Sequence, residues 1–223
     1  FPTRRSSDLS FNCVITMLKQ NSELRAQARE ALRGKWPMAA VAALIYSAIA
    51  GGLSSIPFIG WIGSLLVGLP VAYGFAVLML GVFRGAEEVD LGVLFAGFQE
   101  YSRILSTKLL QAVYTFLWSL LLLIPGIIKH YSYGMTDYIL KDEPELCNNA
   151  AIERSMAMME GNKMKLFLLD LSFIGWAILC LFTFGLGFFV LQPYMQVARA
   201  AFYEDLKAQQ GGFNINVEVN IES

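Results

Sequence analysis

Polar and ionisable side chains recur at helical spacing inside three apolar stretches of the second half of the chain. They are His130, Tyr133, Asp137, Asp170, Gln192, Gln196, Arg199 and Tyr203. Such groups are costly to bury in a bilayer, so they usually face the interior of a helix bundle and pair with one another. We therefore expect a polar seam between these stretches, with the Arg199 guanidinium neutralised by Asp137 or Asp170.

This predicted seam has two interpretations. In the functional one, it forms a path for a small solute, an ion or a proton, and Gly134 and Pro193 break their helices near it, as in some transporters. In the structural one, the polar groups only satisfy one another and fix the register of the helices. Prolines also occur in ordinary membrane helices, and long polar side chains close to the interface can reach the headgroups.

Residue patterns of the common enzyme classes are missing from the sequence. It has no HExxH motif, no GxSxG motif and no glycine-rich phosphate loop. His130 is the only histidine, which excludes a conventional histidine-based metal cluster. Cys147 and Cys180 are far apart in sequence, and their spacing supports neither a zinc site nor a disulfide framework. We predict a protein that is not an enzyme and that has no cofactor.

The composition predicts that the elements carrying these residues lie in lipid. Hydrophobic residues make up 56% of the chain and charged residues 16%, whereas soluble domains carry about 25% charged residues. The mean hydropathy is +0.51. A formal charge of −1 offers no electrostatic attraction for nucleic acid. We expect an all-α, polytopic transmembrane helical bundle whose main partner is the lipid bilayer.

The two ends of the chain differ from its centre. Residues 1–16 begin with FPTRRSSDL, which reads like a translated sequencing adapter followed by read-through to Met17. Residues 17–206 are expected to form a single integral membrane domain. Residues 207–223 alternate apolar and polar residues near their end, and we expect a cytoplasmic tail that is unstructured or forms an edge strand.

Six apolar stretches have the length and composition of membrane spans. They are residues 36–54, 60–83, 106–124, 126–140, 164–182 and 185–203. Amphipathic helices are predicted before every second span, at 22–33, 90–104 and 149–160. From Met17 onward, every lysine and arginine except Lys129 flanks the spans on the side of the N-terminus. Because cytoplasmic loops carry the excess of basic residues, both termini are predicted to be cytoplasmic.

Small residues form one stripe on each of the first two spans. They are Ala39, Ala43, Ser47 and Gly51 in the first span, and Gly60, Ser64, Gly68 and Ala72 in the second. Such stripes let two helix backbones approach closely in lipid, where no hydrophobic effect drives helices together. We therefore expect these two spans to form a tightly packed hairpin.

One supersecondary unit recurs three times along the sequence. Each copy consists of an amphipathic helix, a span, a turn with proline or glycine, and a second span. Gly34, Gly97 and Gly161 mark the copies at intervals of 63 and 64 residues. Gly97 lies inside its amphipathic segment rather than after it, so the match is imperfect. We expect a threefold repeat of helical hairpins, as internal repeats are common in membrane proteins.

Four stretches, by their order and spacing, resemble one protein family. They are ELRAQAREALRGKW (23–36), IPGIIKHYSYGMTDYILKDEP (124–144), AIERSMAMMEGNKMKLFLLDLSFIGW (151–176) and PYMQVARAAFYEDL (193–206). The chain from Met17 to Leu206 is similar to the bacterial integral membrane family called domain of unknown function nine hundred and seventy-five. This resemblance implies a bacterial cytoplasmic membrane protein, and it implies no activity. A more distant resemblance is to the membrane module of some glycerophosphodiester phosphodiesterases, whose activity is not carried over without their catalytic domain.

These observations lead to two main functional hypotheses. The first is a non-enzymatic accessory or envelope-related factor that acts through protein or lipid partners. Its amphipathic helices would lie in the cytoplasmic interface or dock a partner protein. The second is a small-solute or ion transporter or channel that uses the polar seam between the fourth, fifth and sixth spans. A membrane enzyme is a third alternative, and no residue pattern requires it.

Overall fold

The structure is a computed structural model that describes residues 19–55, 59–121, 123–183 and 185–221. Within these ranges every regular element is a helix, so the all-α prediction is confirmed. The elements are α1 (Asn21–Ala31), α2 (Trp36–Ser54), α3 (Ile59–Gly63), η1 (Ser64–Gly68), α4 (Leu69–Phe83), η2 (Leu91–Phe98), α5 (Tyr101–Leu121), α6 (Leu123–Ser132), α7 (Thr136–Asp142), α8 (Asn148–Met158), α9 (Lys163–Leu171), α10 (Ile174–Phe182) and α11 (Phe188–Ile221). The predicted boundary after residue 16 lies outside the described residues.

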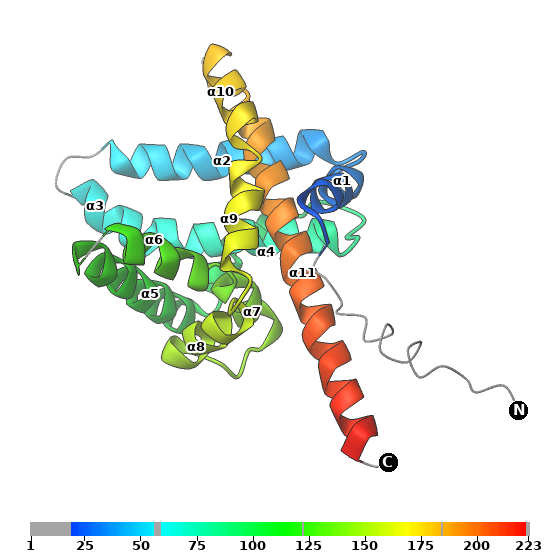
Figure 1. The fold of residues 1–223 in the computed structure, drawn as a ribbon. Coiled ribbons are helices and arrows are strands. Elements are labelled where there is room, and N and C mark those ends of the chain that lie inside the picture. The colour runs from blue at the N-terminus through cyan, green and yellow to red at the C-terminus, as the bar shows by residue number, and fades with distance from the viewer. Residues whose placement is uncertain (1–18, 56–58, 122, 184, 222–223) are drawn as a thin grey trace, which may run out of the picture.

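The helices follow one another in three units of similar order (Figure 1). Each unit starts with a short helix and continues into two longer limbs: α1, α2 and α3–α4; then η2, α5 and α6–α7; then α8, α9–α10 and α11. The amphipathic helix expected at 90–104 is wrong in its extent. The 3-10 helix η2 ends at Phe98 and α5 begins at Tyr101, because η2 bends away to pack against α4.

Two of the three spaced glycines make the same turn. Gly34 follows α1 and Gly161 follows α8, with φ angles of +79° and +75°. Glycine adopts this left-handed backbone without the penalty that a Cβ brings. Gly97 differs, because it lies within η2 and a Cβ there would overlap the carbonyl oxygen of Pro70. Gly97 therefore serves close packing rather than a turn.

Close backbone packing joins the first unit to the second. A Cβ at Gly74 on α4 would overlap the Leu94 carbonyl oxygen of η2, just as Gly97 approaches Pro70. In the predicted stripes, Ala39, Ala43 and Gly60 are buried, Ser47, Ser64, Gly68 and Ala72 are half-buried, and Gly51 is exposed. Glycines outside those stripes therefore provide the closest approaches that involve α4.

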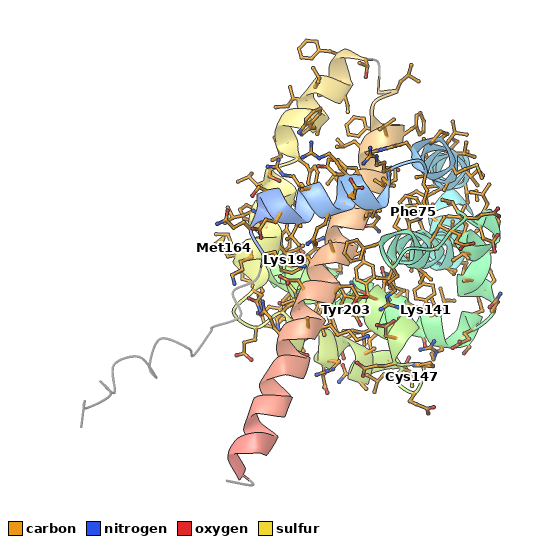
Figure 2. All side chains as sticks on the ribbon, turned by 90° about the vertical axis from the view of Figure 1, so that its right-hand side faces the viewer. Lys19, Phe75, Lys141, Cys147, Met164 and Tyr203 are labelled. Atoms are coloured by element: carbon orange, nitrogen blue, oxygen red, sulfur yellow. The ribbon has the colours of Figure 1, made fainter. Side chains whose placement is uncertain are left out.

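The limbs of the first and third units run in different directions. Figure 1 shows α2 and α4 side by side across the view, whereas α9, α10 and α11 run from top to bottom and cross them steeply. In Figure 2, after a quarter turn, α11 is still upright and α1 crosses it. Leu24, Ala28 and Leu32, which lie on or just after α1, are fully buried. The limbs do not form one parallel bundle in this arrangement.

The core forms around α4. From Val71 to Leu80, every residue except Ala72 is buried. On the adjoining helices, the ring of Tyr138 on α7 stacks on that of Tyr203 on α11, with centroids 5.2 Å apart. The central helix therefore positions α7 and α11, which carry most of the polar residues selected from the sequence.

Among the described residues, two helical stretches, Ser64–Phe83 and Lys163–Phe182, are long and apolar enough to cross a membrane, judged by length and composition alone. They correspond to the second and fifth predicted spans. The first is 61% buried and the second 22% buried. Hence the α4 limb is a core helix, and the α9–α10 limb exposes its apolar surface. The fourth predicted span is not one continuous helix, because residues 133–135 separate α6 from α7.

The last helix extends further than expected. α11 ends at Ile221, so the prediction of an unstructured or extended tail is wrong for the backbone up to that residue. Lys207, Ala208, Gln209 and Gln210 have high helix propensities and continue the helix beyond the apolar stretch that ends at residue 203. The two glycines that follow cost about 1 kcal/mol each relative to alanine, which does not end the helix here.

Candidate functional site

The Arg199 guanidinium on α11 faces the Asp170 carboxylate on α9. Its Nη2 lies 2.8 Å from Oδ2 and its Nε lies 3.1 Å from Oδ1. This two-point contact uses the planar fork that distinguishes arginine from lysine. The Asp170 side chain is only 13% exposed. Of the two partners that the sequence suggested for Arg199, Asp170 is the one that contacts it.

Asp137 on α7 has a different partner. The Lys108 Nζ on α5 lies 2.8 Å and 3.1 Å from its two carboxylate oxygens. Both side chains are largely buried. Sequence reasoning missed Lys108 because it grouped this residue with the basic flanks of the spans. Its position just inside the apolar stretch 106–124 was the available signal.

A cavity of about 230 Å³ lies between α2, α4, α7 and α11. Its lining includes Tyr46, Phe75, Asp137, Gln192, Gln196 and Arg199. Four of the eight predicted seam residues therefore share one space. The first hairpin supplies the opposite wall, where the rings of Tyr46 and Phe75 stack with centroids 5.1 Å apart. Sequence reasoning did not include this wall, because it placed the seam among the last three spans only.

The two glutamines in this cavity have hydrogen-bonding capacity left. The Ser47 hydroxyl on α2 donates to Gln192 Oε1 at 3.4 Å. Within the described residues, the Gln192 amide nitrogen and the Gln196 side-chain amide make no hydrogen bond. An amide group offers both donors and acceptors. The cavity can therefore hold a small polar molecule as well as water.

Three of the predicted seam residues lie elsewhere. His130 is exposed on α6. Tyr133 is buried at the break between α6 and α7, where its carbonyl accepts from the Gln111 amide at 3.4 Å. The Tyr203 hydroxyl donates to the Asp142 carboxylate at 3.0 Å. The predicted seam is therefore divided into a cavity and separate contacts on either side of it.

The two candidate helix breakers behave differently. Pro193 lies inside α11, and the helix continues through it. Gly134 lies in the turn that separates α6 from α7. A Cβ at Gly134 would come within 3.2 Å of the Leu166 side chain of α9. Only Gly134 therefore marks a broken helix.

A further polar cluster, which we call the Asp142 junction, joins the ends of α4 and α7 to the middle of α11. It consists of Arg84 after α4, Asp142 at the end of α7, and Tyr203, Glu204 and Lys207 on α11. Arg84 donates to the two Asp142 oxygens at 2.7 Å and 2.6 Å, and Lys207 donates at 2.6 Å. These helices are the second limbs of the three units, so one carboxylate ties all three together. Sequence reasoning selected only Tyr203 of this junction, because the charged members lie in separate segments that flank the predicted spans.

The junction shifts the acidity of its members. Burial raises the pKa of Asp142, but the hydrogen bonds from Arg84 and Lys207 outweigh burial and lower that pKa to about 2. The hydrogen bond to Asp142 in turn raises the pKa of the Arg84 guanidinium. At neutral pH the Asp142 carboxylate and the Arg84 guanidinium are therefore both charged.

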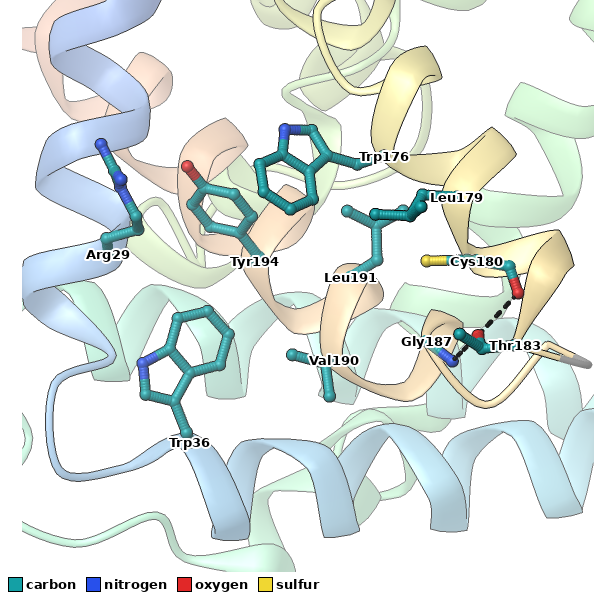
Figure 3. A pocket seen from close by; sticks show the side chains of 10 residues that line it. All are labelled: Arg29, Trp36, Trp176, Leu179, Cys180, Thr183, Gly187, Val190, Leu191 and Tyr194. Carbon is teal, nitrogen blue, oxygen red and sulfur yellow. Dashed lines mark hydrogen bonds between the residues drawn. The ribbon is translucent and has the colours of Figure 1, made fainter.

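An apolar groove of about 330 Å³ lies between α1, α2, α10 and α11 (Figure 3). Its walls come mainly from Trp36, Trp176, Leu179, Val190 and Leu191. Arg29 stands at one end. At the other end, the Thr183 hydroxyl donates to the Cys180 carbonyl at 2.8 Å and closes the turn after α10. The groove was not predicted, because it forms between two pairs of consecutive helices, α1–α2 and α10–α11, that are distant from each other in sequence.

Comparison with protein families covers nearly all of the described chain. One family model matches residues 17–129 and 120–210. The chain belongs to the family described as Protein of unknown function (DUF975). The family suspected from the four sequence stretches is thereby confirmed. Comparison with curated proteins and with solved structures finds no match, and the kinship with glycerophosphodiester phosphodiesterases stays a prediction.

The polar groups of this DUF975 protein are suited to holding its helices in position and to binding a ligand. Each of the three carboxylates described above has a basic partner within hydrogen-bonding distance. In the described part of the chain, no three His, Cys, Asp or Glu side chains gather in a way that could hold a metal ion. The cavity glutamines and the groove beside Arg29 are the places where a ligand would find groups available for binding.

Proposed function

We propose that this chain is an integral protein of the bacterial cytoplasmic membrane that acts without catalysis, through lipid or protein partners. The observation that carries the proposal is the apolar surface at the ends of two hairpins. Near the turn between α5 and α6, Leu120 and Ile124 are 74% and 70% exposed. At the end of α10, Leu181 and Phe182 are 68% and 79% exposed. Monomeric soluble proteins rarely expose such contiguous apolar surface, whereas lipid tails accept it.

The hairpin of α9–α10 and α11 is the best candidate for insertion, because most of the apolar surface of Lys163–Phe182 is available to lipid. Transmembrane helices tilt by at most about 40° from the bilayer normal. α2 and α4 cross this hairpin steeply (Figure 1). The hairpin of α2 and α4 and the hairpin of α9–α10 and α11 therefore cannot both lie close to the bilayer normal in this arrangement. The apolar stretches suggest a topology of six spans. In that topology, the axes of α2 and α4 would have to rotate until they are roughly aligned with those of α9–α10 and α11.

The distribution of basic residues supports a cytoplasmic position for both termini. The exception on the opposite side is Lys129 of α6. Its Nζ lies over the ring of Trp118 on α5, 5.0 Å from the centroid. This cation–π contact gives the charge a partner within the hairpin. A cytoplasmic N-terminus and C-terminus are therefore compatible with a lysine at this position.

Fractionation and cysteine labelling test the proposal on the full chain. Retention in the membrane pellet after carbonate extraction supports insertion, and release into the supernatant overturns it. For topology, native cysteines are replaced by alanine, and Ser55→Cys after α2 or Thr183→Cys after α10 is added. An impermeant maleimide applied to intact cells should label Thr183→Cys. Labelling of Ser55→Cys as well supports six spans, and a variant retaining only Cys147 should react only after permeabilisation.

The polar cavity favours a second candidate function, the binding or transport of a small polar solute or ion. The Gln196 amide and the Gln192 amide nitrogen line this space together with Arg199, which is paired with Asp170. Flux into liposomes tests this candidate. Gln196→Leu should abolish any flux while leaving the ion pairs intact, and an equal flux in the variant rules the cavity out as the path.

A further inference from the structure

The groove of Figure 3 is apolar along its walls and basic at one end. Trp36 begins α2, Trp176 lies on α10, and Leu191 lies on α11, so three helices supply its walls. Arg29 on α1 is the only charged side chain among its lining residues in the described part of the chain. An apolar groove with a single cationic side chain at its end has the polarity of a lipid-binding site.

The charge of Arg29 is available to a ligand. Its side chain is exposed, and no carboxylate of the described residues lies within ion-pair distance of it. Arg33, which follows α1, differs because its Nη1 lies 3.4 Å from Glu30 Oε1. An unneutralised arginine beside an apolar space favours an anionic headgroup, since the guanidinium fork matches phosphate oxygens.

Aromatic residues frame the same end of the groove. The Tyr194 hydroxyl donates to the Arg25 carbonyl of α1 at 3.2 Å, which fixes α1 against α11. The Tyr194 ring lies 6.0 Å from that of Trp36, measured between centroids. Neither Trp36 nor Trp176 donates its indole N–H to another described residue. Tryptophans are enriched where membrane headgroups meet acyl chains, and there the indole N–H can reach a headgroup.

We propose that this groove binds one acyl chain of an anionic phospholipid and that Arg29 holds its phosphate. The inference rests on the proposed membrane insertion and names the partner. The volume of about 330 Å³ suits part of one acyl chain rather than a whole phospholipid. A second copy of the chain is a poorer occupant, because its insertion would leave the Arg29 charge without an anion.

Native mass spectrometry of the intact chain in a mild detergent tests the proposal. Phosphatidylglycerol and phosphatidylcholine with identical acyl chains are titrated separately. We expect one phosphatidylglycerol to bind preferentially. Arg29→Gln should weaken that binding about fivefold, the factor that ~1 kcal/mol per basic residue near an anionic surface corresponds to. Arg33→Gln, the matched control on an ion-paired arginine, should leave the affinity unchanged.

A second variant tests the acyl-chain site independently. Val190→Trp places a larger side chain into the groove at a half-exposed position and should reduce binding of both lipids. Equal affinity for the two lipids together with no effect of Arg29→Gln overturns the proposal, and so does a lipid-free dimer that Val190→Trp dissociates. If carbonate releases the chain from membranes, the proposed function fails as well. If the chain stays in the membrane and Arg29→Gln leaves lipid affinity unchanged, only this inference fails.

Discussion

Replacing Asp142 with asparagine should destabilise the protein, and the loss should disappear in acid. The carboxylate is 9% exposed and accepts hydrogen bonds from Arg84, Tyr203 and Lys207. Asp142→Asn keeps the shape but removes the charge that holds the second limbs of all three units together. Arg84 would keep only Glu204 as an ion-pair partner.

The magnitude follows from the acidity of Asp142. Its pKa is lowered from 3.8 to about 2 in the folded protein, which corresponds to about 2 kcal/mol at 1.36 kcal/mol for each pH unit. Arg84 is 38% exposed, so water screens part of the interaction, and we expect about 1.5 kcal/mol. Because the folded pKa is lowered, this stability is complete above about pH 4 and is lost as the pH falls toward about 2.

Thermal unfolding in a fixed detergent measures this effect through the intrinsic fluorescence of the four tryptophans, which can be followed at pH 7 and at pH 2. At pH 7, Asp142→Asn should lower the Tm by about 3–6 °C, since 1 kcal/mol shifts the Tm of a chain of this size by about 2–4 °C. The gap should close near pH 2. Glu143→Gln is the control, because its carboxylate lies 3.5 Å from Arg154 with both side chains exposed. An equal Tm at pH 7, or a gap that persists at pH 2, would refute the reasoning.

Two further stability predictions use the same assay. Gly74→Ala should cost about 1–3 kcal/mol, because the new methyl group overlaps the backbone of η2. Gly81→Ala, on the same helix with no neighbour within 4 Å, should be neutral or stabilising by up to about 1 kcal/mol, and equal effects of the two would contradict the close packing. Arg199→Leu should cost about 3 kcal/mol, the low end for a broken buried pair, because it leaves the Asp170 carboxylate without a partner while the Arg199 side chain is 34% exposed. Adding Asp170→Leu should recover most of that loss, and failure to recover would count against the pairing.

The helices could be predicted from the sequence to the extent that local pattern decides them. Apolar stretches marked the long limbs, and the glycines after α1 and α8 marked their turns. The direction of the limbs could not be predicted this way, because it depends on which surfaces pack together. The contact of Gly74 with η2 is one such case: nothing local to α4 shows that another backbone will approach there.

The sequence predicted which residues belong to the candidate site, but it did not predict which residues they contact. Helical spacing identified Asp137, Gln192, Gln196 and Arg199 as residues facing a common interior, and these four line one cavity. Spacing within a helix cannot reveal the neighbouring helix, so it did not show that Lys108 neutralises Asp137. The same limit applies to Asp142, whose partners come from helices that are distant in the sequence.

Basic side chains that are paired with a carboxylate lie in different places from the polar groups that have no such partner, and this difference bears on function. Arg199, Lys108 and Arg84 each hold a carboxylate at close range, so a ligand would have to displace an existing ion pair to use them. Arg29 and the Gln196 amide hold no such partner among the described residues. A ligand binding at these two positions gains contacts without breaking others. Binding function should therefore be sought first at the groove beside Arg29 and at the glutamine side of the cavity, with the paired charges serving as the frame that positions both.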